Sequence, residues 1–483
     1  MSATFFEING TIVDVTAGSI YEGTVIVNDG KITSIRREPA TRQQFILPGL
    51  IDAHIHVESS MLIPSEFARI AVTHGTTGTV SDPHEIANVL GIDGVRFMIA
   101  NGSKVPFRFW FGAPSCVPAT PFETAGAEIG VKEIGELITM PEVRYLSEMM
   151  NFPGVLAKDP GVMAKLELAK QAGKPVDGHA PGVTGQNAAD YIAAGISTDH
   201  ECFTLGEARE KIGLGMHVLI REGSAARNFG TLWPLIDEFP GQVMLCSDDK
   251  HPDDLVAGHL DRIIRRGIVL GLDPINLIRC CTLNPVIHYD LDAGLLRPGD
   301  PADITVVDGL ASFKVMETWI GGVKVAEHGR TLIAGTTETP INRFGIGPVS
   351  EDAIRVVAAD GKIRVMTAAD GELITGSELA DPLVVDGNVV SDISRDILRI
   401  VVKNRYSESP AGIGFIRNFG LKRGAIASSV AHDSHNIVAV GTDDSSIAKA
   451  INLVIREKGG IAWVDSDHSD VLPLPFAGIM SGM

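Results

Sequence analysis

Histidines and carboxylates recur along this chain at the ends of short runs of apolar or β-branched residues. The segments are LIDAHIHV, YLSEMM, VDGHAP, STDHE and MLCSDD. A buried parallel strand is expected to be apolar throughout, and burying an unpaired His or Asp in it costs free energy. Because a bound cation removes this cost, the pattern predicts a metal centre built from the ends of successive strands.

The spacing of these segments predicts the fold that carries them. Between residues 49 and 290, short β-rich runs alternate with helical stretches of about ten residues or more, which is typical of βα units with parallel strands. We predict strands at residues 50–57, 75–82, 108–116, 143–150, 175–181, 197–203, 216–224 and 243–249. Eight alternations indicate an α/β fold of the (β/α)8 TIM barrel type, in which the chemistry is built where the strand C-termini converge.

The segments that flank the barrel return to β character. Residues 1–48 and 291–344 hold short β runs broken by Gly, Pro and Asn-Asp-Gly turn signals, and we expect both parts to complete one small β unit. Residues 345–483 combine further β runs with a helical pattern at SIAKAINLVIREKGG. This last region therefore predicts a separate C-terminal α/β domain.

The charge of the chain restricts its partners. A formal net charge of −19 over 483 residues repels phosphate backbones and anionic lipid, so we expect neither nucleic acid nor a membrane as a partner. The sequence opens without a basic segment followed by an apolar stretch and cleavage site, and no apolar run of about 20 residues occurs. The five cysteines include no CxxC pair, so we expect a cytoplasmic protein. Because of the negative net charge, we expect its substrate to be a small neutral or cationic molecule.

The predicted strand ends supply a set of candidate metal ligands. His54 and His56 stand two apart on one strand, so both face the same side and can bind one cation or two adjacent ones. Glu148 can bridge two metals through its oxygens. The full set is His54, His56, Glu148, His179, His200 and Asp248. These ligands exceed the three of a mononuclear catalytic zinc site, so we predict two divalent ions, for which imidazole and carboxylate suit Mn, Fe or Zn.

These motifs carry a family resemblance. The segment PGLIDAHIHVESSM, with the later DGHAPG, TDHE and CSDD, resembles the amidohydrolase superfamily, which pairs a metal-bearing barrel with a small β-sandwich made from both chain flanks. The segments SDPHEIANV, REGSAARN, SDDKHP and RNFGLKRGAIASSVAHDSHN are most similar to the branch that deaminates adenine. The resemblance implies conversion of adenine to hypoxanthine and ammonia by a metal-bound hydroxide, with Mn or Fe(II) as the expected ions.

The same resemblance implies roles for three carboxylates. Asp248 is expected to take the hydroxide proton and pass it to the departing ammonia, while Glu148 bridges the metals. Glu85 is expected to protonate or hydrogen-bond the ring nitrogen, or to reach the metal; its alternative role is that of an acid at a helix N-terminus. His84 is a candidate for orienting the substrate, with a surface role as the alternative.

Further residues are candidates for contacts around the substrate. Ser224 and Arg227, with Arg221, are candidate purine contacts, and helix capping or structural ion pairing is the alternative for each. Asp249 should point away from Asp248 if the strand stays regular. The HDSH segment at 432–435 either covers the site or consists of buried structural polar residues.

Two alternatives to the deamination of adenine stay open at this point. The same barrel architecture also hydrolyses other aminated heterocycles or cyclic amides, commonly with a carboxylated lysine as bridge, whereas the fourth strand here offers Glu148. Members of the deaminating branch also continue beyond LPLPFAGIM, so a shortened C-terminal domain with an incomplete site cover, and with it an inactive homologue, is the other alternative. A symmetric homodimer is the expected assembly.

Overall fold

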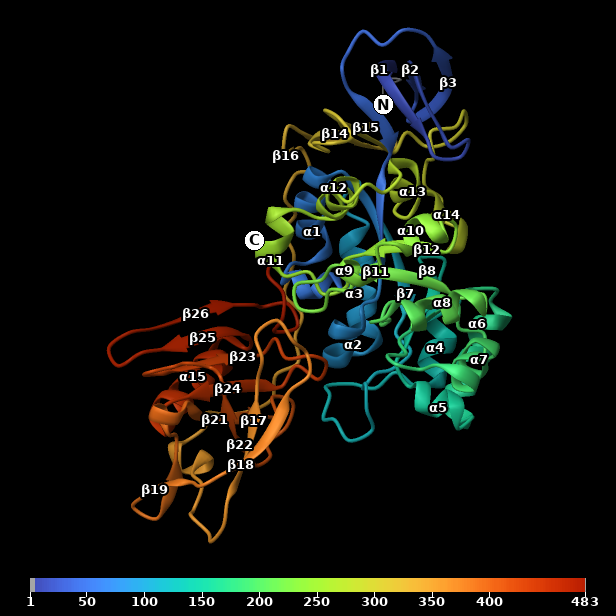
Figure 1. Ribbon diagram of the computed structural model, residues 1–483. Coiled ribbons are helices and arrows are strands. Elements are labelled where there is room, and N and C mark those ends of the chain that lie inside the picture. Colours follow the sequence, from blue (N-terminus) through green and yellow to red (C-terminus); the bar gives the residue numbers. More distant parts are fainter. Residues whose placement is uncertain (1–4, 483) are drawn as a thin grey trace.

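A ring of eight parallel strands forms the centre of the computed structural model, which describes residues 5–482 (Figure 1). The strands are β5 (Leu50–Ile55), β6 (Thr76–Ser81), β7 (Arg108–Ala113), β8 (Val143–Met149), β9 (Val176–Gly178), β10 (Thr198–Asp199), β11 (His217–Arg221) and β12 (Val243–Cys246). Five of these strands form one hydrogen-bonded sheet in the order β5-β6-β7-β8-β9, and the other three form a second sheet in the order β10-β11-β12. The (β/α)8 barrel predicted from the sequence is confirmed.

Two backbone contacts join these sheets into the ring. Ser197 N donates to Val176 O over 2.9 Å at one seam, and Asp248 N donates to His54 O over 3.0 Å at the other. Inside the ring, a buried cluster that includes Ile51, Trp110 and Tyr145 fills the space between the strands. The barrel interior is therefore a packed core, as in other barrels of this kind.

Helices surround the barrel and connect its strands. They are α1 (Pro64–Ala71), α2 (His84–Leu90), α3 (Ile92–Gly102), α4 (Val131–Leu137), α5 (Phe152–Leu156), α6 (Pro160–Gln171), α7 (Gly185–Ala193), α8 (Leu205–Gly213), α9 (Phe229–Leu232), α10 (Leu235–Glu238), α11 (Pro252–Ala257), α12 (Leu260–Val269), α13 (Pro274–Arg279) and α14 (Leu283–His288). Asp159 and Asp273 each cap a helix whose first residue is proline, by accepting two backbone N–H bonds. None of the helices in the described part of the chain is both long and apolar enough to cross a membrane.

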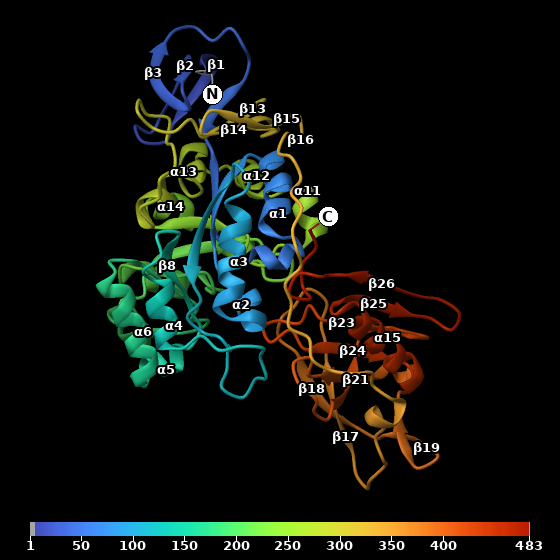
Figure 2. The same cartoon turned by 180° about the vertical axis from the view of Figure 1, so that it is seen from behind.

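Both flanks of the barrel contribute to one eight-stranded sheet, at the end of the molecule that carries the N-terminal segment in Figures 1 and 2. Its strands are β1 (Phe5–Asp14), β2 (Ser19–Asn28), β3 (Lys31–Arg37), β4 (Phe45–Pro48), β13 (Ile304–Val307), β14 (Val315–Ile320), β15 (Val323–Glu327) and β16 (Arg330–Thr331). The two flanks meet where β4 pairs with β13. Residues 1–4 and Met483, at the ends of the predicted outer domains, lie outside the described residues.

The C-terminal region forms a second eight-stranded sheet with one long helix, on the opposite side of the barrel (Figure 2). The elements are β17 (Ile363–Thr367), β18 (Gly376–Ala380), β21 (Ile397–Lys403), β22 (Gly412–Arg417), β23 (Ala425–Ser428), β24 (Ile437–Gly441), β25 (Gly460–Val464), β26 (Ser469–Pro473) and α15 (Asp444–Glu457), with a separate hairpin of β19 (Leu383–Val385) and β20 (Asn388–Val390). The apolar face of α15 packs on small side chains of the sheet, including Ala425, Ala427 and Ala439.

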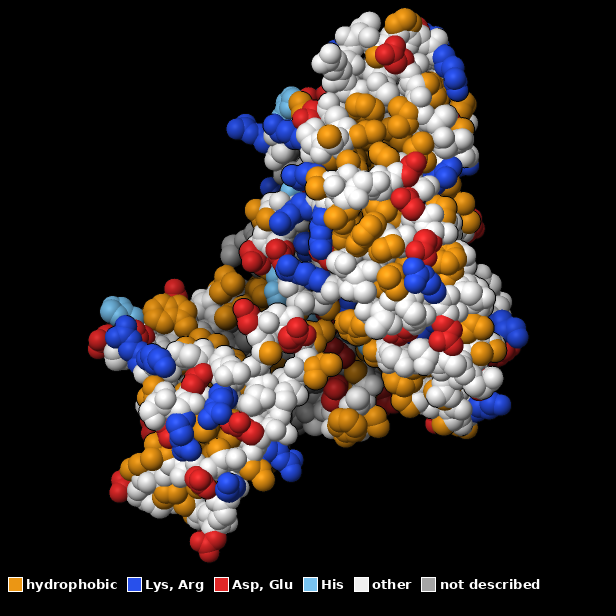
Figure 3. All heavy atoms as spheres, in the orientation of Figure 1, with side chains coloured by type: hydrophobic (Ala, Val, Ile, Leu, Met, Phe, Trp, Pro, Cys, Tyr) orange, Lys and Arg blue, Asp and Glu red, His pale blue; other side chains and the backbone are white. Residues whose placement is uncertain are grey.

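The end of the chain ties this domain to the barrel. Phe476 is buried in a cluster with residues of α1 and α2 and stacks on Phe97 with ring centroids 5.5 Å apart. Ile63 N donates to Ser481 O over 3.0 Å just after the first barrel strand. The face of the molecule in Figure 3 mixes acidic, basic and apolar side chains, so the acidic excess is not gathered in one patch on that face.

Candidate metal centre

The C-terminal ends of the barrel strands bring all six predicted ligands together, with Glu148 at their centre. Glu148 Oε1 is 3.3 Å from His56 Nε2, while Glu148 Oε2 is 2.8 Å from His179 Nδ1 and 3.2 Å from His200 Nε2. Glu148 is buried at the end of β8, so both of its oxygens face imidazoles and not solvent. A single carboxylate is thus positioned to serve two cations.

Asp248 closes the other side of the group. Its Oδ1 lies 3.3 Å from His56 Nε2 and 3.8 Å from His54 Nε2. The backbone of Asp248 has a positive φ of 52°, a left-handed conformation that is uncommon for a residue other than glycine and turns the chain out of the strand. The strand is therefore not regular at this point, and the condition under which Asp249 points directly away does not hold.

The donor set fits a divalent cation. Both ring nitrogens of His54 are buried without a hydrogen-bond partner in the described structure, although the ring stacks on His200 with centroids 4.3 Å apart. The nearest carboxylates are Asp177 at 3.9 Å and Asp248 at 3.8 Å. An unpaired buried imidazole costs free energy, and imidazole-carboxylate sets bind divalent ions, so His54 could hold such an ion.

The electrostatics of the group keep its carboxylates ionised. Burial alone would raise the pKa of the Glu148 carboxyl, but His179, His200 and His56 hold that pKa well below its usual range. Burial opposes ionisation of Asp248 in the same way, and His56, His200 and Arg221 lower its pKa. Both groups therefore offer anionic oxygens to a cation at neutral pH.

Arg221 lies buried beside this group. Its guanidinium donates to both oxygens of Glu201, over 2.5 and 2.8 Å, and also to Asp248 Oδ2. Only 3% of Arg221 is exposed. Both terminal nitrogens of Arg221 donate to carboxylates, so this buried side chain holds Glu201 and Asp248 in place and does not face an open space where a purine would bind.

Ser224 and Arg227 lie apart from the ligand group, in the loop after β11. Ser224 Oγ donates to Asp254 over 2.8 Å, and Arg227 donates to Gly223 O over 2.8 Å with about half of its side chain exposed. Both line a cavity of about 710 Å³ whose opposite wall is the loop 370–374 of the C-terminal domain. Ser224 N donates to Asp249 O over 2.8 Å, so this cavity lies next to the corner formed by Asp248.

Two acidic residues of the group were not predicted. Asp82 directly follows β6, and its Oδ2 is 3.0 Å from His84 Nδ1, which in turn is 3.4 Å from Glu148 Oε1. Glu201 follows His200 and lies 3.4 Å from its Nε2. Asp82 is the last residue of the predicted strand 75–82, and Glu201 lies within the predicted strand 197–203, next to His200. A search of all acids near the predicted strand ends would therefore have found both.

Glu85 is buried in the first turn of α2 and is contacted by the C-terminal domain. His432 Nδ1 and His435 Nε2 each form a short contact with one of its oxygens, and His84 Nε2 is 3.3 Å from its Oε1. Burial would raise the pKa of the Glu85 carboxyl, but His432 and His435 hold it well below its usual range. The HDSH segment at 432–435 therefore covers the barrel face, and His435 is also buried.

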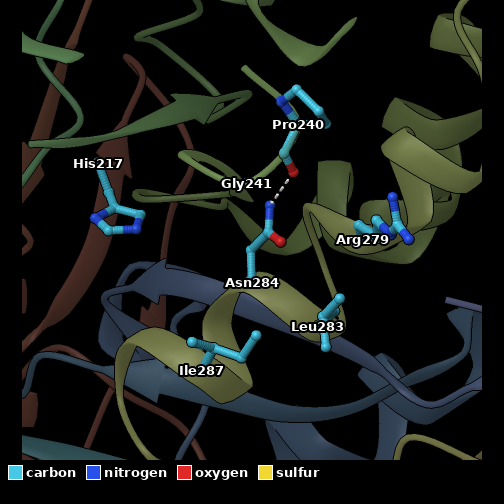
Figure 4. A pocket seen from close by; sticks show the side chains of 7 residues that line it. All are labelled: His217, Pro240, Gly241, Arg279, Leu283, Asn284 and Ile287. Atoms are coloured by element: carbon cyan, nitrogen blue, oxygen red, sulfur yellow. Dashed lines mark hydrogen bonds between the residues drawn. The ribbon is translucent and has the colours of Figure 1, made fainter. Parts of the chain in front are cut away.

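A small hollow lies at the opposite end of the barrel. Figure 4 shows His217, at the start of β11, facing a space of about 180 Å³ whose other wall includes Leu283 and Ile287 of α14. Asn284 Nδ2 donates to Pro240 O over 2.8 Å beside it. This hollow lies at strand N-termini, away from the carboxyl ends where barrels of this type build their active sites.

Comparisons with known proteins agree with this geometry. The sequence model of the amidohydrolase family matches residues 45–337, and that of the adenine deaminase C-terminal domain matches residues 372–483. Adenine deaminases of Methanosarcina mazei and Salinibacter ruber are each 53% identical to this chain, over 98% and 99% of its length respectively and 87% of their own. The adenine deaminase of Borreliella burgdorferi is 44% identical over 99% of this chain and 88% of its own length.

A solved structure shares the fold at low sequence identity. The N-acetyl-D-glucosamine-6-phosphate deacetylase of Mycobacterium smegmatis is 16% identical, with a TM-score of 0.50 over 66% of this chain and 100% of its own. This likeness supports the barrel fold alone, whereas the sequence relatives extend through the C-terminal domain. The chain therefore belongs to the amidohydrolase family and, within it, to the adenine deaminases.

Proposed function

We propose that this chain catalyses the hydrolytic deamination of adenine to hypoxanthine and ammonia with two divalent metal ions, Mn or Fe(II) in the first place and Zn as the alternative. The observation that carries the two-metal assignment is Glu148, whose two oxygens each face different histidines. The adenine assignment rests on the relatives at 53% identity, which extend over nearly the whole chain.

The six ligands form two sets that overlap at His54, and Glu148 contacts a histidine of each set. His54, His56 and Asp248 have ligand atoms within 4.8 Å of one another, and so do His54, Glu148 and His200. His179 joins the second set through Glu148 Oε2. When bound, the ions lower the pKa of water towards neutrality and so supply a nucleophile for attack on C6 of the purine.

Asp248 is the residue proposed to move protons at C6. Its carboxylate is held ionised beside Arg221, so it can accept a proton from the attacking water and then give it to the departing amine. Its Oδ1 lies 3.3 Å from His56 Nε2, which supports this assignment. Ser224, Arg227 and His84 are proposed to contact the purine.

The cellular setting is part of the proposal. All five cysteines are free and buried, which supports a reducing compartment and hence the cytoplasm. The chain is proposed to work as a homodimer on a free purine base, with neither nucleic acid nor a membrane as partner. The net charge of −19 supports the last point.

Turnover of adenine tests the proposed activity. Protein loaded with Mn or Fe(II) should convert adenine to equal amounts of hypoxanthine and ammonia, followed by chromatography of the base and by an ammonia assay. Dihydrouracil, a cyclic amide, and cytosine, another aminated heterocycle, serve as competing substrates under the same conditions. Hydrolysis of either competitor without any release of ammonia from adenine would contradict the assignment.

A further inference from the structure

The loop at residues 429–436, between β23 and β24, reaches from the C-terminal domain onto the barrel face. Hydrogen bonds fix it on both sides. Tyr406 Oη donates to Ser434 O over 2.7 Å, and Ser429 Oγ donates to Gly478 O over 2.6 Å, both within the C-terminal region. Asn436 Nδ2 donates to Thr124 O over 2.9 Å, in the barrel. The histidines of this loop are therefore held in place over the barrel.

Both oxygens of Glu85 are contacted by histidines of the C-terminal domain. Its Oε2 accepts from His435 Nε2, and its Oε1 is contacted by His432 Nδ1. Only about 1% of the Glu85 side chain is exposed. The buried Glu85 carboxylate is therefore paired with both histidines.

The hydrogen bonds assign the tautomer of His435. Ala431 N–H donates to His435 Nδ1 over 3.2 Å, so the ring proton resides on Nε2. That proton is donated to Glu85, which makes Glu85 an acceptor and hence a carboxylate. His435 thus orients Glu85 as a buried neutral imidazole.

His432 differs from His435 in what its second nitrogen meets. Its Nδ1 is held by Glu85, whereas its Nε2 has no partner among residues 5–482. About 34% of the His432 side chain is exposed, and Asp249, the neighbour of Asp248, lies 3.9 Å from its Nδ1. Nε2 is thus the nitrogen of His432 that Glu85 leaves available to another partner.

We propose that His432 is a catalytic residue of the C-terminal domain, which donates a proton from Nε2 to the ring nitrogen N1 of adenine while Glu85 and His435 hold its ring. This role rests on the proposed function. It reassigns Glu85 from direct contact with the ring to orientation of the proton donor, in the way that a carboxylate orients a catalytic histidine in other hydrolases.

The proton transfers balance. As the water oxygen bonds to C6, the π pair of the C6–N1 bond moves to N1, which takes the His432 proton, and Asp248 takes one water proton. Asp248 then returns that proton to the amine, the C6–N6 bond breaks, and ammonia leaves. The remaining hydroxyl proton passes to solvent as the C6 carbonyl forms, and His432 regains a proton from solvent.

The charges around His432 support its role as donor. Burial alone would lower its pKa, but Glu85 and Asp249, with Asp433, raise the pKa of His432 to about 10. Two other imidazoles also contact the Glu85 carboxylate: His84 Nε2 is 3.3 Å from Oε1, and His435 Nε2 contacts Oε2. The imidazole is accordingly protonated at neutral pH before substrate arrives.

Chemical rescue tests the proposal. His432→Ala should lower kcat for adenine by about 10²–10⁴-fold, the usual contribution of a positioned acid or base. Added imidazole should restore part of this activity in a saturable manner, because the vacated position is open to solvent. In His432→Ala combined with Glu85→Gln, imidazole should give no rescue, since the carboxylate that orients it is lost. Metal content and thermal midpoint are measured for each variant to confirm that it folds.

His468→Ala is the matched control, because His468 is an exposed histidine in the same domain, between β25 and β26. It should keep wild-type kcat and show no response to imidazole. Activity of His432→Ala within about threefold of wild type, or a folded and metal-loaded inactive variant without imidazole rescue, would overturn the role of His432 alone. Wild-type protein that releases no ammonia from adenine would overturn the proposed function as well.

Discussion

Replacing Asp248 by Asn is expected to lower kcat/KM for adenine by about 10⁴-fold, the upper end of what a positioned acid or base contributes. The amide keeps the shape of the side chain but cannot accept the water proton at neutral pH. It also removes a negative charge that lies 3.3 Å from His56 and is paired with Arg221. A loss of this size corresponds to about 5.4 kcal/mol of transition-state stabilisation.

Asp253→Asn is the control for this variant, because Asp253 is an exposed acid five positions further along the chain. It should keep the wild-type rate and metal content. Rates are compared at equal bound metal, measured by elemental analysis, because Asp248 is also a proposed ligand. An Asp248→Asn enzyme that holds its metals and retains more than about a tenth of the activity would exclude Asp248 as the proton carrier.

Replacing Glu148 by Gln is expected to reduce bound metal from two ions per chain to one or none and to abolish measurable deamination. The amide nitrogen is a donor and cannot serve as a ligand, so one of the two sets of imidazoles loses its anionic partner. Changes to groups that merely support a ligand weaken metal binding by roughly 10–100-fold, and loss of the shared ligand itself should exceed that range.

Glu142→Gln provides the comparison, since Glu142 is exposed immediately before the same strand, β8. It should bind metal as the wild type does. Elemental analysis after gel filtration reads out the metal content of both proteins. Two tightly held ions in Glu148→Gln would show that this carboxylate is not the bridge.

The barrel was predictable from the sequence because its signal is local and repeated. Each strand was recognised from a short β-rich run, and each candidate ligand from a polar residue at the end of that run. Parallel strands in a closed barrel bring such ends together whatever the loops between them do. For this reason His54 and Asp248 were expected at one site although they are far apart in the chain. The distance between His54 Nε2 and Asp248 Oδ1 is 3.8 Å.

The features that could not be predicted depend on long-range packing or on backbone geometry. The contact between Glu85 and His435 joins residues 350 positions apart in different domains, and no local pattern encodes it. The positive φ of Asp248 breaks the alternation on which the placement of Asp249 relied. The carboxylate partners of Arg221, Glu201 and Asp248, come from other strands. The sequence around Arg221 does not reveal them, and for this reason Arg221 was predicted as a purine contact.

The shared use of Glu148 by two metal ions is the central claim, and titration of metal-free protein with Mn or Fe(II) tests it most directly. Bound metal and the rate of ammonia release from adenine are measured together at each addition. The account predicts that both saturate near two equivalents per chain, with little turnover at one equivalent. Full activity at a single equivalent, or in metal-free protein, would contradict it.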